Sequence, residues 1–436
     1  MSADARRLAR LRLPTAKELL SPFGVLLIVY AYYILFVYSG VHRYVFWELM
    51  NLLTRIIGYQ PSGEVVGVYL FGALALVFGF LGGAMLARGV DGRDESRAPL
   101  ARVRDAYARL CGRLESLPVL RTTGLAMTVF AIGCAFAFFM NAMQVNILGV
   151  ASLTDIATRW QQSAVLVYFA SLQIFFVPAL VVFSKKRWHW ALAAVAFSLS
   201  TVALTLLGAR NLPAKLVLAV FLAAVWRVKP QHLWKIVAIA LVVFVAALGI
   251  VGALSKSGIY GPAASAGLVV ALTYSDSAGT IYNLDRIVHV TPPTGAFGGK
   301  LLLDSAKALI PGLPADYSNY QLGKYLGVRS YFVIDNQRIN RSVSLSTSIA
   351  GAPYADWGVP GVALVMTFLG LLFGYLQRRS RAALWLLPFL VMYASYAING
   401  VNAGVYNPHA IVATSVTLTV LAIDLLTGRP APAPES

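Results

Sequence analysis

The chain has 436 residues, of which 58% are hydrophobic and only 12% are charged, and its mean hydropathy is +0.70. These values exclude an ordinary soluble globular protein, in which about a quarter of the residues are charged. The net charge of +18 would suit a nucleic-acid-binding protein, but the basic residues follow a membrane topology instead, so we expect no nucleic-acid partner.

Apolar runs of about twenty residues recur along the chain, and each is long enough to cross a hydrocarbon core of roughly 30 Å as a helix. They predict an all-α polytopic membrane protein with about ten transmembrane helices. The predicted spans are Pro22–Gly40, Val65–Leu86, Thr122–Asn141, Ser163–Ser184, His189–Gly208, Leu212–Trp226, Ile236–Ala253, Trp357–Leu376, Ala383–Asn399 and Ala410–Thr427.

The lysines and arginines give the orientation of these spans. If the N-terminus is cytoplasmic, the inner segments carry 23 of them, the short outer loops carry 5, and the long segment between the seventh and eighth spans carries 8. Positive residues concentrate on the cytoplasmic side, and long loops weigh little in this rule. We therefore expect both termini in the cytoplasm and the long segment 254–356 outside.

This topology divides the chain into four parts. Residues 1–253 hold helices 1–7, with a cytoplasmic amphipathic loop at 88–121, and residues 254–356 form one large outer loop. Residues 357–427 hold helices 8–10, and the Pro- and Ala-rich tail 428–436 is expected to be disordered. We find no internal repeat, which argues against an inverted-repeat transporter.

The outer turn between the fifth and sixth spans has the features of an anion site. Asn211 is a good helix cap and Pro213 suits a first turn, so the sixth helix would direct its positive dipole end toward the outer surface. Arg210 and Lys215 flank that end, and together these groups suit a diphosphate. The alternative is that both side chains only reach the membrane interface as anchors.

The long outer segment combines tyrosines with arginine, asparagine and aspartate residues. Aromatic faces edged by such groups suit sugar rings, which present apolar faces rimmed by hydroxyls. The candidate sugar-binding side chains are Tyr274, Asn283, Arg286 and Tyr354. Packing of the tyrosines within the protein is the alternative for each of them.

No metal or cofactor site is indicated. The five histidines are isolated, and the chain has no CxxC, HExxH or Gly-rich phosphate motif, so we expect neither metal nor nucleotide and no other cofactor. His409, in Tyr406-Asn407-Pro408-His409, lies at the outer end of the last predicted span. It is a candidate base or phosphate contact, with a simple interfacial histidine as the alternative.

Three groups of residues between Ser163 and Gly361 form a pattern. The first is Leu206–Asn211, a Gly-x-Arg turn between two spans. The second comprises Leu272–Asp276, Tyr282–Leu284 and Ile310–Gly312 in the long outer segment, and the third comprises Ser348–Gly351, Tyr354, Asp356–Gly358 and Gly361, where that segment returns to the membrane. The pattern resembles the Gly-x-Arg turn and the large periplasmic loop of the Wzy-type oligosaccharide repeat-unit polymerases, which make O-antigen, enterobacterial common antigen and exopolysaccharide.

The resemblance implies a GT-C-like glycosyltransferase that joins undecaprenyl-diphosphate-linked glycans at the outer face of a bacterial inner membrane. Arg210 would stabilise the departing diphosphate, helped by Arg338 or Arg341, and Asp276 would assist the attacking hydroxyl. The implied partners are the lipid-linked oligosaccharides, membrane lipid and a Wzz-type chain-length co-polymerase.

Two alternatives remain open on the sequence. The related O-antigen ligases share the architecture but show a histidine late in the large loop, and Ser330–Ser348 contains none. Many family members also have an acidic residue just after the glycine, where this chain has Gly351-Ala352-Pro353-Tyr354. A transporter or flippase for a lipid-linked oligosaccharide would use a similar basic site without forming a bond.

Overall fold

The computed structural model describes residues 19–33, 62–91, 118–142, 164–207, 211–228, 230–235, 237–238, 242, 280–310, 318–334, 337–342, 346–381 and 383–427. The middle of the cytoplasmic loop predicted at 88–121, most of the seventh predicted span and the tail 428–436 lie outside these residues.

The described part of the chain is mainly helical, with a single two-stranded antiparallel hairpin. The helical fold class is therefore confirmed, and the hairpin is an addition that the sequence pattern did not predict. The elements are α3 (Pro22–Tyr32), α6 (Gly63–Asp91), α8 (Pro118–Ala142), α10 (Ala164–Ser171), α11 (Gln173–Val182), α12 (Arg187–Leu206), α13 (Asn211–Arg227), η2 (Pro230–His232), α16 (Lys300–Lys307), α17 (Ser318–Tyr325), β1 (Arg329–Ile334), β2 (Gln337–Ser342), α18 (Ser348–Arg379), η4 (Leu384–Leu386), α19 (Leu387–Ala403) and α20 (Pro408–Thr427).

Among the described residues, 4 helices are long and apolar enough to cross a membrane: Gly63–Arg88, Arg187–Thr205, Ser348–Arg379 and Leu384–Ala403. Each overlaps a predicted span. Shorter apolar helices at Pro22–Tyr32, Thr122–Phe138, Leu166–Val182 and Pro408–Ala422 overlap four more. Large apolar side chains remain exposed along α6, α8 and α12, which is the pattern of helices that face lipid.

The fourth predicted span, Ser163–Ser184, is broken into α10 and α11. At Leu172 the backbone hydrogen bonds join residues three positions apart instead of four. The N–H of Leu172 donates to Phe169 O at 3.2 Å, and its carbonyl accepts from Phe175 N at 3.0 Å. The side-chain amide of Gln173, which is fully buried, donates to Ala170 O at 2.9 Å. An apolar run predicts that a helix is present, but not where its bonding changes.

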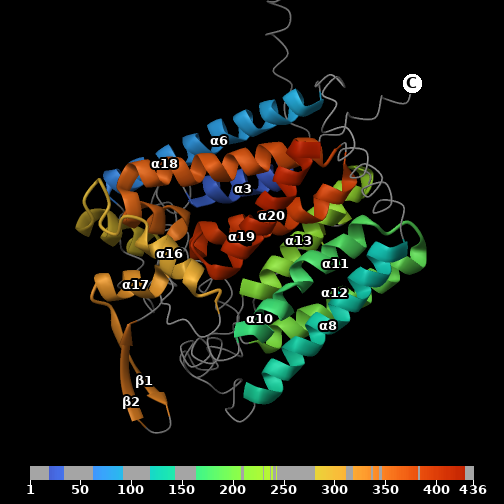
Figure 1. The fold of residues 1–436 in the computed structure, drawn as a ribbon, viewed down its shortest axis with the longest axis horizontal. Coiled ribbons are helices and arrows are strands. Elements are labelled where there is room, and N and C mark those ends of the chain that lie inside the picture. Colours follow the sequence, from blue (N-terminus) through green and yellow to red (C-terminus); the bar gives the residue numbers. More distant parts are fainter. Residues whose placement is uncertain are drawn as a thin grey trace, which may run out of the picture.

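Helix α18 begins at Ser348, well before the predicted start of the eighth span at Trp357, and bends at Gly358. Gly358 has φ 66° and ψ −149°, a conformation that side chains disfavour, and a Cβ there would overlap the carbonyl of Pro293. Val359 N donates to that same carbonyl at 3.2 Å. The bend thus lets the first turns of α18 pack against the polar segment before the helix continues beside α6 (Figure 1).

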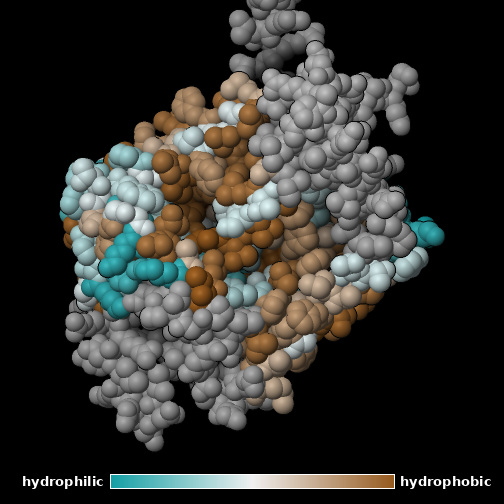
Figure 2. Space-filling view, in the orientation of Figure 1, coloured by the Kyte–Doolittle hydropathy of each residue, from teal (hydrophilic) through white to brown (hydrophobic). Residues whose placement is uncertain are grey.

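The described polar segment 280–342 attaches to one end of the helix bundle, which we call the loop end. Asp285 Oδ1 accepts from Ser62 Oγ at 2.6 Å, next to the start of α6, and Tyr168 of α10 donates to Ala308 O at 3.1 Å. Asn319 of α17 donates to Ala403 O, at the end of α19. Figure 2 shows polar residues over α16 and α17 and apolar residues over much of the helices.

Candidate functional site

The buried amine of Lys215 is the centre of the candidate site. Lys215 lies in the first turns of α13, is only 2% exposed, and places Nζ 4.6 Å from the ring centroid of Tyr396 of α19. Among the described residues, no carboxylate forms an ion pair with it. A buried cation that is balanced only by an aromatic ring is costly, and an anionic ligand would offset that cost.

His409, in the first turn of α20, lies within electrostatic range of this amine. It is 8% exposed, and its ring centroid lies 4.8 Å from that of Tyr168 of α10. Four helices thus bring together Lys215, His409, Tyr168 and Tyr396, which we call the cationic cluster. The sequence identified Lys215 and His409 separately, and the structure brings them together at the loop end.

Asn211 is the first residue of α13. Its side-chain oxygen is buried and has no hydrogen-bond donor among the described residues, so the side-chain cap expected from the sequence is absent. A physical reason is that Pro213, two residues on, has no N–H to donate to such a cap.

Three predicted site residues, Arg210, Tyr274 and Asp276, lie outside the described residues. The backbone of Arg338 and Arg341 lies in β2, where they pair with Val333 and Ser330 of β1. This hairpin extends away from the helices beyond α17 (Figure 1). The roles of these five residues stay predictions.

The remaining sugar-binding candidates make internal contacts. Asn283 Nδ2 donates to Ser346 O at 2.9 Å, just before α18, and Arg286 donates to Leu326 O at 3.0 Å, just after α17. Tyr354 is 1% exposed within the first turns of α18. Asn283 and Arg286 thus help to hold the polar segment in place, and Tyr354 is buried. A contact of any of the three with a substrate stays a prediction.

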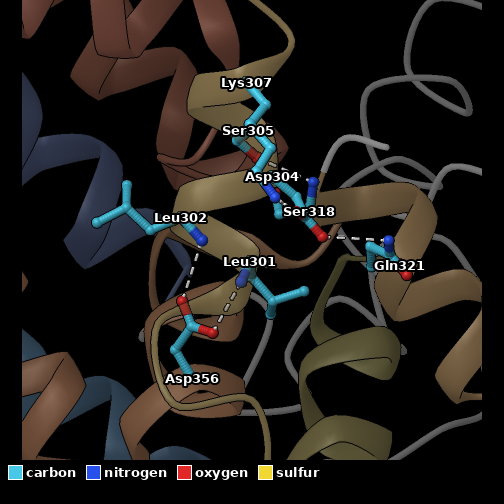
Figure 3. Close-up of polar contacts among 8 residues, drawn as sticks. All are labelled: Leu301, Leu302, Asp304, Ser305, Lys307, Ser318, Gln321 and Asp356. Atoms are coloured by element: carbon cyan, nitrogen blue, oxygen red, sulfur yellow. Dashed lines mark hydrogen bonds and ion pairs between the residues drawn. The ribbon is translucent and has the colours of Figure 1, made fainter. Parts of the chain in front are cut away.

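Asp356 caps helix α16. Its two carboxylate oxygens accept from Leu301 N at 3.0 Å and Leu302 N at 3.2 Å (Figure 3). These N–H groups are the second and third of α16, the ones that an N-cap side chain normally satisfies. The residue at the N-cap itself is Gly299, which has no side chain. Asp356 therefore fixes the polar segment to the bend of α18.

Helix α17 is fixed in turn to α16. Asp304 accepts from Lys307 Nζ at 3.2 Å and from Gln321 Nε2 at 3.3 Å, and Ser318 N donates to Ser305 Oγ at 2.9 Å. Figure 3 shows these contacts next to the Asp356 cap.

Replacing Asp356 by Ala should lower the free energy of unfolding by about 1–2 kcal/mol, because one buried and one partly buried N–H group of α16 lose their acceptor. Asp356→Asn keeps one acceptor oxygen and should lose less. Thermal unfolding of the detergent-solubilised protein measures both. Wild-type stability in Asp356→Ala would contradict the capping role.

Tyr168 and Tyr396 are site residues that the sequence did not indicate. Both lie in apolar runs, where an aromatic residue usually packs or anchors a span, and their position beside Lys215 depends on the order in which the helices pack. Only a map of helix–helix contacts would have revealed them.

The comparison with known proteins places the chain in a family. The family model described as "Putative O-antigen polymerase" matches residues 19–413, which include α3 through the first turns of α20. No curated protein and no solved structure matches the chain. Together with the apolar helices, the match identifies a membrane-embedded protein of the glycosyltransferase type. The chain belongs to the O-antigen polymerase family.

Proposed function

We propose that this protein polymerises a polysaccharide by transferring a growing undecaprenyl-diphosphate-linked glycan onto a lipid-linked repeat unit. The observation that carries the proposal is the buried amine of Lys215 at the loop end, which has no carboxylate partner among the described residues and has His409 within electrostatic range. A diphosphate at a membrane surface is the anion that such a cluster suits.

In the proposed reaction, a sugar hydroxyl of the acceptor attacks the anomeric carbon of the donor. A new glycosidic C–O bond forms, the bond to the lipid diphosphate breaks, and the diphosphate leaves with the electron pair. The hydroxyl proton passes to a carboxylate, for which we propose Asp276. Charge grows on the leaving group in the transition state, so fixed cations there accelerate the reaction most. We assign this role to Arg210, with Lys215 and Arg338 or Arg341 assisting, and His409 as a contact of the phosphate.

The proposal includes the membrane topology. In it, the protein has about ten transmembrane helices in a GT-C-like arrangement in a bacterial inner membrane, with both termini in the cytoplasm and segment 254–356 in the periplasm. Residues 280–342 contact the start of α6, α10, the residues just before α20 and the end of α19. These contacts support a topology in which all these helix ends lie on the same side of the membrane. We also propose a Wzz-type co-polymerase as the partner protein and exopolysaccharide or O-antigen as the product.

Deletion of the gene tests the function. Surface glycans of the deletion strain should lose their ladder of long chains, and the wild-type gene should restore it. If single repeat units still reach the surface of the deletion strain, the flippase alternative is excluded. An unchanged ladder in the deletion strain would overturn the proposal.

A further inference from the structure

The connection between α11 and α12 carries three consecutive exposed cations, Lys185, Lys186 and Arg187. Arg227, the last residue of α13, is also exposed, and its Nη2 donates to Ser184 O at 3.1 Å, which joins the end of α13 to this connection. Because α13 begins at the cationic cluster, its last residue lies at the end of the bundle opposite the loop end (Figure 1). We call these four cations the distal patch.

No acidic side chain offsets the charge of the distal patch. The segments Ser184–Trp190 and Arg227–Lys235 contain neither aspartate nor glutamate. Within the described part of the chain, none of the four cations forms an ion pair. Neighbouring like charges repel one another, so an anionic ligand at this surface would be bound favourably.

Two tryptophans follow the cations directly. Trp188 is 60% exposed and Trp190 is 38% exposed, in the first turn of the apolar helix α12. The ring of Trp188 stands edge-on to that of His189, with 4.0 Å between the two centroids. Exposed tryptophans at the end of a membrane helix lie at the level of the lipid headgroups. The distal patch therefore combines positive charge with the side chains that are typical of the headgroup region.

His189 fixes the backbone of this turn. Its side chain is 4% exposed, and its Nδ1 accepts from Lys185 N at 3.2 Å and from Lys186 N at 3.1 Å. The two lysines thus extend from a preformed turn. Less conformational entropy is lost when preformed groups bind one ligand than when a flexible basic segment does.

We propose that the distal patch binds an anionic phospholipid of the leaflet opposite the loop end. The lysines and arginines would contact its phosphate oxygens through charge-assisted hydrogen bonds. The rings of Trp188 and Trp190 would contact the glycerol and the first carbons of the acyl chains. This lipid site lies at the other end of the bundle from the proposed polymerase reaction and does not depend on it.

The test measures lipid binding to the purified full-length protein in an uncharged detergent. Phosphatidylglycerol should raise the melting temperature in a saturable manner, because a ligand that binds only the folded protein stabilises it. Phosphatidylcholine, in which a choline cation balances the phosphate, should raise it far less. Replacing all three cations of the turn, by Lys185→Gln, Lys186→Gln and Arg187→Gln together, should weaken the affinity for phosphatidylglycerol about 10- to 100-fold.

The folding of this triple variant is checked in the same experiment. Its melting temperature without lipid should equal that of the wild type, because the three side chains are exposed and have no ion-pair partner in the described part of the chain. The matched control removes three cations at the loop end, by Lys300→Gln, Lys307→Gln and Lys324→Gln together. This control has the same net charge as the triple variant and should keep the wild-type affinity.

Trp188→Ala together with Trp190→Ala separates a lipid from a free anion. This double variant should bind phosphatidylglycerol about three- to tenfold more weakly, because the rings no longer contact the lipid. Equal stabilisation by phosphatidylglycerol and phosphatidylcholine, or an equal loss of affinity in the loop-end control, would overturn the proposal. Stabilisation by inorganic phosphate alone would mean an anion site without lipid recognition and would overturn it as well. Since no glycan is needed, the result is independent of the proposed polymerase function.

Discussion

Replacement of Lys215 by Met is expected to abolish glycan polymerisation while the protein keeps its amount and stability. The amine is buried, and its aromatic neighbour Tyr396 compensates only part of the cost of removing a cation from water. Methionine removes that cost, so the free protein should be as stable as wild type or more stable. Loss of a cation that stabilises a leaving group should slow the reaction about 100- to 1,000-fold.

The measurement is the surface glycan ladder of the deletion strain carrying each variant, with the melting temperature of each purified protein. Lys215→Arg keeps the charge and should retain part of the ladder, and Arg210→Ala should lose it as Lys215→Met does. Lys307→Met is the control, since Lys307 also lies at the loop end but is 43% exposed in its ion pair with Asp304. Such exposed pairs contribute little. A full ladder in Lys215→Met would contradict a role of the amine in the reaction and would leave only an anchoring role at the membrane interface.

The membrane helices follow from composition, because crossing a hydrocarbon core requires a long apolar helix whatever its neighbours are. Helices α6, α12, α18 and α19 therefore overlap predicted spans. The break at Leu172 and the extension of α18 back to Ser348 depend on contacts with other segments. Gly358 shows the difference: it lies at the start of the predicted span Trp357–Leu376, but only the carbonyl of Pro293 explains the bend and why no side chain fits there.

The site was predictable only residue by residue. Lys215 and His409 could be selected because both lie where a predicted span meets the outer surface, and Lys215 flanks a helix N-terminus that suits an anion. Their proximity depends on α13, α19 and α20 being neighbours, which span lengths do not specify. The cap of α16 by Asp356 joins residues 55 positions apart, so local patterns give no indication of it.

The pair α6 and α18 is held by four glycines in reciprocal positions. Gly79 and Gly83 of α6 face the backbone carbonyls of Thr367 and Leu371, and a Cβ at either glycine would overlap them. In return, Gly370 and Gly374 of α18 face the carbonyls of Leu76 and Phe80 in the same way. Each helix therefore carries a Gly-x-x-x-Gly pair, which allows two membrane helices to approach closely. Because α18 also carries Asp356, which caps α16, the attachment of the polar segment depends on this contact.

Gly83→Ala should destabilise the protein by about 1–3 kcal/mol or more, because the added methyl group pushes α6 away from α18 along their length. Gly374→Ala should act in the same way from the other helix. The adjacent Gly82 provides the matched control, since a Cβ there meets nothing within 4 Å. Gly82→Ala should instead stabilise the protein by up to about 1 kcal/mol, because alanine favours the helix more than glycine does. Melting temperatures of the three purified variants decide the matter. Equal effects of Gly82→Ala and Gly83→Ala would mean that helix propensity, and not the contact with α18, determines the stability of α6.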